Sequence, residues 1–316
     1  MSWDYNKGLH ELGNGAWAWL APDGSWGWSN AGLITDGEQS LLVDTLFDLD
    51  LTAEMLKSMQ DAAPLAAANF DTLVNTHANG DHCHGNELVT GAEIIASSAS
   101  AAEMAELTPD AMAAIVAAAK EMGPVGDYFL HCFGQFRFDG IRFTPPTRTF
   151  DGALDVQVGD KQVQLIEVGP AHTRGDVLVL SPADKTVFTG DILFIEGTPI
   201  MWQGPVANWI AACERIEAMD VDTIVPGHGP LTDKAGVRAV REYLQYVHDE
   251  ARIRYDNGMS AMQAAQDIEL GPYRDWLDSE RIAVNVDSLY REFGNEAQTT
   301  DIMELFTQMA SIAGFK

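Results

Sequence analysis

The sequence predicts a mixed α and β fold in which two successive βα halves pack sheet on sheet, with helices on the outside. Three observations lead to this prediction. Short runs of β-branched and apolar residues alternate with segments of helical periodicity, and this alternation occurs twice within residues 1–230. Residues 231–316 then keep helical spacing almost throughout. We therefore expect a domain over 1–230, with a helical and aromatic insertion at 100–150, and a C-terminal helical extension over 231–316.

The first half opens with β-structure. Residues 16–20 alternate in the manner of a strand, and expected strands at 30–35 and 40–45 flank the hairpin signal Asp36-Gly37. A helix with an apolar stripe is expected over 48–62. A buried strand at 72–74 follows it, and another strand is expected at 92–96.

The middle of the chain is expected to be helical and then irregular. A short helix is predicted at 101–106, and Thr108 followed by a proline is typical of a helix that then runs to about residue 122. Residues 124–150 are rich in aromatic side chains and lack a clear period, which suggests a lid or an edge of a binding pocket. His131 lies there without acidic or histidine neighbours, so we expect a structural role for it.

The second half repeats the strand signals and ends in helices. The expected strands cover 154–158, 161–168, 177–180, 186–189 and 222–225, and a helix is expected over 206–219. Beyond residue 231, Ser260 is the expected cap of one helix, Asp278 or Ser279 of the next, and Thr299 or Thr300 of the last. We expect this extension to serve in packing or dimerisation; a cap over the substrate pocket is the alternative.

The charge of the chain limits its partners. It carries 19 basic and 47 acidic residues, a formal net charge of -28. Such a surface repels nucleic acid and anionic membranes, so we expect neither as a partner. The opening residues lack a basic and apolar signal pattern, no long apolar run occurs, and the three cysteines are far apart. These features favour a cytoplasmic protein without disulfides, with Cys83 as a small buried residue.

A cluster of polar residues follows the expected strand at 72–74. The segment 75–86 contains His77, Asp81 and His82, all within a few residues of one another. Metal ligands are best held at the end of a buried strand, where a rigid backbone brings side chains into a cleft. We therefore expect these three residues to bind metal.

Three further turns carry the same type of residue. His172, Asp191 and His228 each follow an expected strand and each lie beside glycine or proline, which shape tight turns. Five of the eight histidines of the chain fall in this set of turns. Packing alone does not explain that distribution, so a shared metal site is the better interpretation.

The order of these motifs resembles the metallo-β-lactamase superfamily, whose signature is His-x-His-x-Asp-His followed by His, Asp and His. The resemblance covers about residues 28–231 and implies a four-layer αβ/βα sandwich with the metal site at one edge. It implies that His77 and His172 belong to a first metal position and that Asp191 bridges two positions. It further implies that Asp81, His82 and His228 form the second position, and that Asp44 supports the ligands from behind.

One residue departs from that signature. Asn79 stands where the family has its second histidine, and an amide oxygen is a weaker ligand than an imidazole. The site then holds either one metal ion or two, with the first bound loosely; we favour the second outcome slightly. His84 as a replacement ligand is an alternative, although a place beside the pocket is the expectation for it.

These ligands suit hydrolysis. We expect a metal-bound hydroxide to attack an ester, thioester, lactone or amide bond of a small, partly apolar substrate, with Asp81 orienting or deprotonating the water. Zinc is the expected metal, as one or two ions, with iron or manganese as alternatives. Two other interpretations remain open: an iron-dependent non-hydrolytic oxidoreductase, and a ligand-binding protein with a weakened metal site.

Four residues are candidates for the substrate pocket. Trp26 and Trp28 belong to a group of four tryptophans, at 17, 19, 26 and 28, which either pack in the core or form an aromatic flap. Trp202 follows the Asp191 turn, where it lines a pocket or packs under the next helix. Arg174 beside His172 contacts a substrate carboxylate or lies at the surface. A small-molecule substrate is expected, and a homodimer through the C-terminal helices is an alternative use of the extension.

Overall fold

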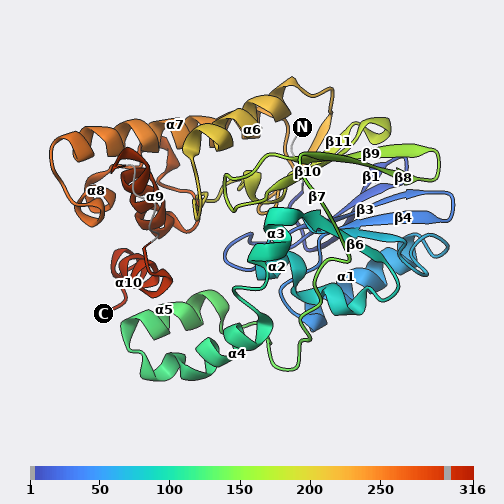
Figure 1. Ribbon diagram of the computed structural model, residues 1–316, viewed down its shortest axis with the longest axis horizontal. Helices are drawn as coiled ribbons and strands as arrows, with labels where there is room; N and C mark the ends of the chain where they lie inside the picture. Colours follow the sequence, from blue (N-terminus) through green and yellow to red (C-terminus); the bar gives the residue numbers. More distant parts are fainter. Residues whose placement is uncertain (1–3, 295–299) are drawn as a thin grey trace.

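The computed structural model describes residues 4–294 and 300–316. In this part of the chain two β-sheets face each other, with helices on both outer sides (Figure 1). The larger sheet has the strand order β1-β2-β3-β4-β5-β6-β7, with β1 Gly8–Gly13, β2 Ala16–Leu20, β3 Ala31–Asp36, β4 Gln39–Val43, β5 Thr72–Val74, β6 Glu93–Ser97 and β7 Arg148–Phe150. The smaller sheet has the order β12-β11-β10-β9-β8, with β8 Ala153–Val158, β9 Lys161–Glu167, β10 Val177–Ser181, β11 Thr186–Phe188 and β12 Thr223–Val225. The predicted sandwich of two sheets is confirmed.

Both sheets combine antiparallel and parallel pairs in the same way. In the larger sheet β1 to β4 pair antiparallel and β4 to β7 pair parallel. In the smaller sheet β8 to β11 pair antiparallel, and β11 pairs parallel with β12. The carboxyl ends of parallel strands meet at one edge of a sheet. The turns after β4, β5, β11 and β12 therefore gather at one edge of the sandwich.

The core between the sheets is filled by alternate residues of each strand. Ile34 and Val74 point toward the opposite sheet, whereas Leu33 and Leu73, one position earlier, point toward the helical layer outside. Gly32 leaves room for a side chain from across the sandwich, because a Cβ there would lie 2.0 Å from Cε1 of Phe188. The two sheets are thus held in close contact over a continuous apolar interior.

Helices cover the outer faces. The described α-helices are α1 Leu49–Ala62, α2 Gly80–Cys83, α3 Ser98–Glu103, α4 Pro109–Ala118, α5 Pro124–Phe133, α6 Val206–Ala218, α7 Lys234–Asp256, α8 Ala261–Asp267, α9 Ile282–Gly294 and α10 Ile302–Ile312. Helix α1 begins after Asp48, whose side chain accepts from the Leu51 amide, and it buries Met55 and Met59 against the larger sheet. Helices α6 and α7 cover the smaller sheet. None of the described helices has the length and apolar content that crossing a bilayer requires.

The segment after residue 123 differs from the prediction. Residues 124–133 were expected to be irregular, but they form helix α5. Gly123 has a φ of 65° and Pro124 occupies the first helical position, which is a helix start rather than a helix end. Phe129 and Phe133 then lie on the buried side of the helix. Helix α5 is stabilised by the packing of its apolar face against α10.

The C-terminal caps also differ in part. Ser260 caps α8 as predicted, through a capping box with Gln263. Asp278 precedes the short 3₁₀ helix Ser279–Arg281 that leads into α9, without capping through its side chain. The last helix is capped by Asp301 instead of Thr300, because the Asp301 carboxylate accepts from the amides of Met303 and Glu304. Thr299, the other candidate, lies outside the described residues.

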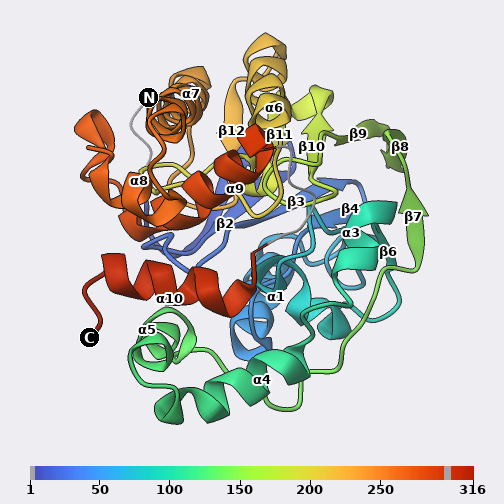
Figure 2. The same ribbon diagram turned by 60° about the vertical axis from the view of Figure 1, so that its left-hand side comes forward.

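The C-terminal extension folds back over the insertion. Helix α10 lies between α5 on one side and α9 on the other (Figure 2). Its buried residues include Phe306 and Met309, which face the aromatic side chains of α5. The extension therefore packs within its own chain and reaches the side of the sandwich on which the predicted ligands lie.

Candidate metal centre

The six predicted metal ligands come together at the edge where the parallel strands end. His77, Asp81 and His82 follow β5, with the last two on the short helix α2. His172 follows β9, Asp191 follows β11 and His228 follows β12. All six lie against one another although they come from four separate turns.

Asp191 lies at the middle of this cluster. Its Oδ2 is 3.6 Å from His77 Nε2, 3.4 Å from His172 Nε2 and 3.5 Å from His228 Nε2. Its Oδ1 is 3.1 Å from His82 Nε2. A Cβ at Gly227 would lie 2.0 Å from Asp191 Oδ1, so the glycine before His228 lets the two turns approach this closely.

The cluster divides into two groups that each have room for an ion. His77, His172 and Asp191 offer three ligand atoms within 4.8 Å of one another, and Asp81, His82 and His228 offer another three. Within the second group, Asp81 Oδ2 lies 3.3 Å from His228 Nε2 and 3.9 Å from His82 Nε2. Asp191 lies between the groups: its Oδ2 faces His77 and His172 of the first group and also His228 of the second, and its Oδ1 faces His82 of the second.

The far nitrogen of each imidazole is tied to the protein, which fixes the ring. Nδ1 of His172 lies 2.6 Å from the Ile200 carbonyl, and Nδ1 of His228 lies 3.1 Å from the Gly24 carbonyl. Nδ1 of His82 lies 2.9 Å from Asp44 Oδ2. Metal-binding histidines in proteins are held in this way, with the other ring nitrogen free to coordinate.

Asp44 supports two of the four histidines. Its carboxylate accepts from the amide and the hydroxyl of Thr76, both at 2.7 Å, and from His82 Nδ1. The Thr76 hydroxyl in turn lies 3.1 Å from His77 Nδ1. The residue predicted to act from behind the ligands thus orients His82 directly and His77 through Thr76.

Several inward-facing atoms have no hydrogen-bond partner. His77 Nε2, His82 Nε2 and Asp191 Oδ1 are fully buried and form no hydrogen bond. Buried polar atoms are almost always paired, because an unpaired one costs about 1–3 kcal/mol. Imidazole nitrogens and a carboxylate oxygen converging on one point are the donor set of Zn²⁺ and similar divalent ions. The residues therefore fit the metal that the sequence predicts.

The electrostatics of the cluster are strongly coupled. Burial lowers the pKa of His77 well below its usual value, so this imidazole stays neutral and able to coordinate. Burial also acts on His228, but the carboxylates of Asp191 and Asp81 raise its pKa to about 9. Burial raises the pKa of Asp81 while His82 and His228 lower it, and the result is about 2. Burial also raises the pKa of Asp191, but His228 and His82 bring it well below its usual value, so both carboxylates of the cluster are ionised.

Asn79 contacts one of the candidate ligands. Its Oδ1 lies 2.7 Å from His172 Nε2, the nitrogen that points toward Asp191. The amide oxygen is therefore within the first group and in reach of whatever that group holds. His84 is not in either group: burial lowers its pKa to about 4, and its ring packs against Phe47 and Phe138.

An aromatic cavity of about 380 Å³ opens directly beside the cluster. Asp81, Asp191, His172 and His228 form part of its wall. The remaining wall is largely apolar and includes Trp26, Phe47, Met112, Phe129, Phe133, Phe194, Trp202 and Phe306. Helices α5 and α10 supply several of these side chains, so the C-terminal extension covers the cavity, which was the alternative expectation for it.

Of the four predicted pocket residues, two line the cavity and two do not. Trp26 and Trp202 line the cavity. Trp28 lies behind its wall with its ring 5.0 Å from that of Phe136, and Arg174 forms ion pairs with Glu103 and Glu106.

Other cavity residues were missed by the sequence reasoning. The aromatic run of residues 128–138 signalled a pocket edge, and Phe129 and Phe133 belong to it. For Arg281 and Phe306 the sequence carried no signal.

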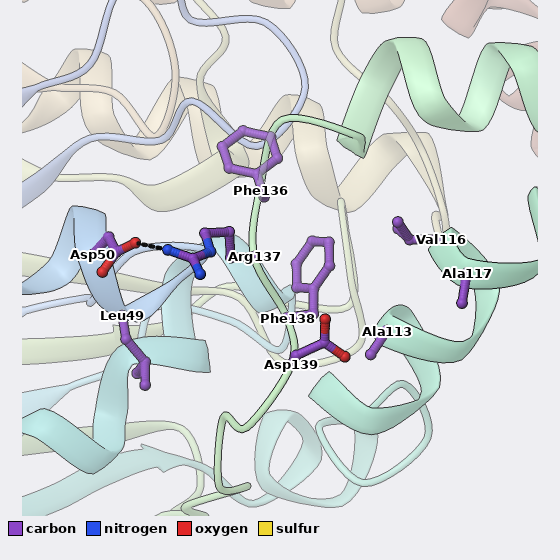
Figure 3. A pocket seen from close by; sticks show the side chains of 9 residues that line it. All are labelled: Leu49, Asp50, Ala113, Val116, Ala117, Phe136, Arg137, Phe138 and Asp139. Carbon is purple, nitrogen blue, oxygen red and sulfur yellow. Dashed lines mark hydrogen bonds and ion pairs between the residues drawn. The ribbon is translucent and has the colours of Figure 1, made fainter.

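Figure 3 shows the residues that line a second cavity, of about 380 Å³. It is bordered by α1, α4 and the loop 136–139, and an ion pair joins Arg137 to Asp50 at its edge. Phe136 and Phe138 line it and also pack against Phe47, which lines the first cavity. Neither candidate metal-binding group is among the residues that line this second cavity.

Comparison with known proteins relates this chain to a protein family. The family model described as the metallo-beta-lactamase superfamily matches residues 24–228. Acyl-coenzyme A thioesterase MBLAC2 of Bos taurus is 29% identical over 100 residues, which cover 30% of this chain and 34% of that protein. Beta-lactamase-like protein 2 homolog of Caenorhabditis elegans is 23% identical over 219 residues, 69% of this chain and 61% of that protein. The chain thus spans less than two thirds of the length of these relatives.

A solved structure supports the fold. The structure of a metallo-beta-lactamase from Pontibacter korlensis has a TM-score of 0.57 and 19% sequence identity, and the match covers 76% of this chain and 99% of that one. The match of the family model over most of residues 1–230, together with the two-sheet sandwich, decides the family. This chain belongs to the metallo-beta-lactamase superfamily.

Proposed function

We propose that this protein is a metal-dependent hydrolase of a small, largely apolar ester or thioester, with lactones and amides as further substrates to test. One observation carries the proposal: four imidazole Nε2 atoms and two carboxylates converge at the wall of an aromatic cavity. The name of the relative acyl-coenzyme A thioesterase MBLAC2 supports a hydrolytic reaction.

The proposed metal is zinc, as one or two ions. His77, His172 and Asp191 would hold the first ion, with Asn79 as a weak fourth contact, and Asp81, His82 and His228 would hold the second. When bound, the metal supplies Lewis acidity, which lowers the pKa of water to about 7 and polarises the substrate carbonyl.

The carboxylate of Asp81 would orient the attacking water, and the apolar wall of the cavity would orient the substrate. Asp81 lies where the ligand cluster meets the cavity, which supports a role for its carboxylate in accepting a hydrogen bond from the attacking water. A carboxylate with a pKa of about 2 is a weak base, so orientation is the larger part of its proposed role. The apolar wall would hold the organic part of the substrate and exclude bulk water from the reacting bond.

The test combines metal content with turnover. We expect elemental analysis of the purified protein to find zinc, and a panel of esters, thioesters, lactones and amides to include a substrate. Asp81→Ala should lower kcat by at least about a hundredfold, as expected for loss of a group that positions the nucleophile. Cys83→Ala is the matched control, because Cys83 lies on the same short helix, donates its thiol to the backbone carbonyls of Ala78 and Asn79, and packs against Ala96 and Met104.

Three outcomes would contradict the proposal. Equal loss of turnover in Asp81→Ala and Cys83→Ala would mean that the helix, and not the carboxylate, matters. Iron with oxygen consumption would indicate an oxidoreductase. A folded protein that contains no metal and turns over no member of the panel would indicate a ligand-binding protein.

A further inference from the structure

The cavity beside the metal centre contains a closed group of aromatic rings. The ring centroids of Trp26 and Trp202 are 6.4 Å apart, those of Trp26 and Phe306 are 5.9 Å apart, and those of Trp202 and Phe306 are 6.3 Å apart. Phe133 joins them at 5.6 Å from Trp26 and 6.0 Å from Phe306. Aromatic rings attract one another at such distances, in tilted and edge-to-face arrangements. The wall thus offers ring faces and edges to whatever enters.

Arg281 is the one arginine among the described lining residues, which include no lysine, and its charge is already neutralised. Arg281 is almost completely buried, with its guanidinium 2.9 Å from the carboxylate of Asp278 and 3.0 Å from the carbonyl of Thr198. Its guanidinium carbon also lies 4.2 Å above the ring of Trp26. An anionic group therefore finds no unpaired guanidinium and no ammonium group among the described residues of this wall.

Acidic groups stand near the mouth of the same cavity. Glu103 and Glu106 line it, and Arg174, which pairs with both, is the cation that compensates them. The whole chain carries a net charge of -28. A carrier with several phosphates or carboxylates would meet repulsion on approach, and away from the ligand cluster the described wall offers it no lysine and no unpaired arginine.

A cationic substrate is disfavoured for a different reason. Aromatic walls bind cations when the ring faces are free, but the guanidinium of Arg281 already occupies a face of Trp26. A second positive group beside Trp26 would also lie near that guanidinium and near the metal ions proposed for the centre. Burial of an unpaired charge of either sign in this wall is therefore costly.

Size and surroundings favour an apolar ring. The cavity of about 380 Å³ lies at the lower end of the range of about 300–1,000 Å³ that is typical of small-molecule pockets. Two exposed apolar side chains, Leu107 and Ile302, 47% and 48% exposed, lie at its lining. A flat apolar group would cover them and displace poorly bound water.

We propose that the ring group of Trp26, Phe133, Trp202 and Phe306 selects an uncharged substrate with a flat aromatic group, and that the cavity discriminates against polyanionic acyl carriers. This inference rests on the proposed function, because it names the substrate class of the same site. The aromatic group would pack against Trp26 and Phe306 while the scissile carbonyl faces the metal-binding side chains.

Binding is measured first, without any reaction. Zinc-loaded protein is titrated in a calorimeter with 2-acetylnaphthalene, naphthalene-2-sulfonate and trimethyl(2-naphthyl)ammonium, which share one ring and differ in charge. We expect the neutral compound to bind at least about tenfold more tightly than either ion, since each ion loses hydration without gaining a partner. Turnover is measured second, as kcat/KM for 2-naphthyl acetate and for acetyl-coenzyme A.

Variants of two phenylalanines test the wall itself. Phe306→Ala removes a ring of the group, and Phe293→Ala is the matched control because that ring packs on Tyr255 and Tyr290 of α7 and α9. We expect Phe306→Ala to weaken binding of 2-acetylnaphthalene about tenfold and Phe293→Ala to leave it unchanged. Phe306→Leu, which keeps most of the volume, provides the same comparison if the alanine variant fails to fold.

The results separate this inference from the proposed function. Tight binding of the neutral ring without hydrolysis of any ester supports the substrate class and contradicts the hydrolase. Hydrolysis with acetyl-coenzyme A preferred over 2-naphthyl acetate supports the hydrolase and overturns the substrate class. Equal affinity for the neutral and charged rings, or equal affinity in the Phe306 and Phe293 variants, also overturns it.

Discussion

The substitution Asp44→Asn tests whether the carboxylate behind His82 and Thr76 holds the candidate metal ligands in place. Asp44 follows β4 with a φ of 62°, in the left-handed region, and its carboxylate accepts from Thr76 and from His82 Nδ1. Asparagine adopts this backbone conformation readily and has nearly the same shape, so the substitution should leave the fold intact. It removes one acceptor oxygen and the negative charge behind His82.

The expected loss follows from these contacts. A carboxylate satisfies three donors here, whereas an amide has one acceptor oxygen and brings two N–H donors of its own. One of the two imidazoles that Asp44 supports therefore loses its fixed orientation. Removal of such a support typically lowers metal affinity about 10- to 100-fold, which is about 1.4–2.7 kcal/mol.

Competition with a chromophoric zinc chelator measures this loss. We expect Asp44→Asn to release zinc at a chelator concentration at least about tenfold lower than the unaltered protein does. Asp71→Asn is the matched control, because the Asp71 carboxylate accepts from the backbone amide of Ser40 and contacts none of the six ligands. Unchanged zinc affinity in Asp44→Asn, with the control also unchanged, would refute the view that this carboxylate fixes the ligands.

Three further predictions concern the centre and the core. Asn79→His places an imidazole beside His172 and should raise the zinc stoichiometry measured by elemental analysis; unchanged stoichiometry would contradict a weak first position. Gly32→Ala forces a Cβ to 2.0 Å from Phe188 and should lower the free energy of unfolding in urea by about 1–3 kcal/mol; a neutral result would mean that the sheets can separate freely. Burial raises the pKa of Asp176 to about 7, above its value of about 4 in an unfolded chain. The folded state therefore binds this proton more tightly than the unfolded state does. As pH rises from about 4 to about 7, the contribution of Asp176 to the free energy of unfolding falls. Asp176→Asn should therefore flatten the loss of unfolding free energy over that pH window, and an unaltered slope would contradict the shift.

Local signals explain where the sequence reasoning about the fold succeeded and where it was wrong. The hairpin at Asp36-Gly37 and the helix start at Thr108 depend on neighbouring residues only, and both occur as predicted. The helix of residues 124–133 was missed because its period is hidden in a run of aromatic side chains. Its stability depends on α10, which is distant in sequence and therefore invisible to a local pattern.

The sequence by itself determined which residues gather at the candidate metal centre. Histidine and aspartate are common metal ligands, and the order of the strands brings the strand ends that hold them to one edge of the sandwich. Only the tertiary structure decided what surrounds them. The cavity takes Trp26 from near the start of the chain and Phe306 from near its end, and no short-range period connects the two. Their contact depends on the packing of the C-terminal helices over α5, which is a property of the whole fold.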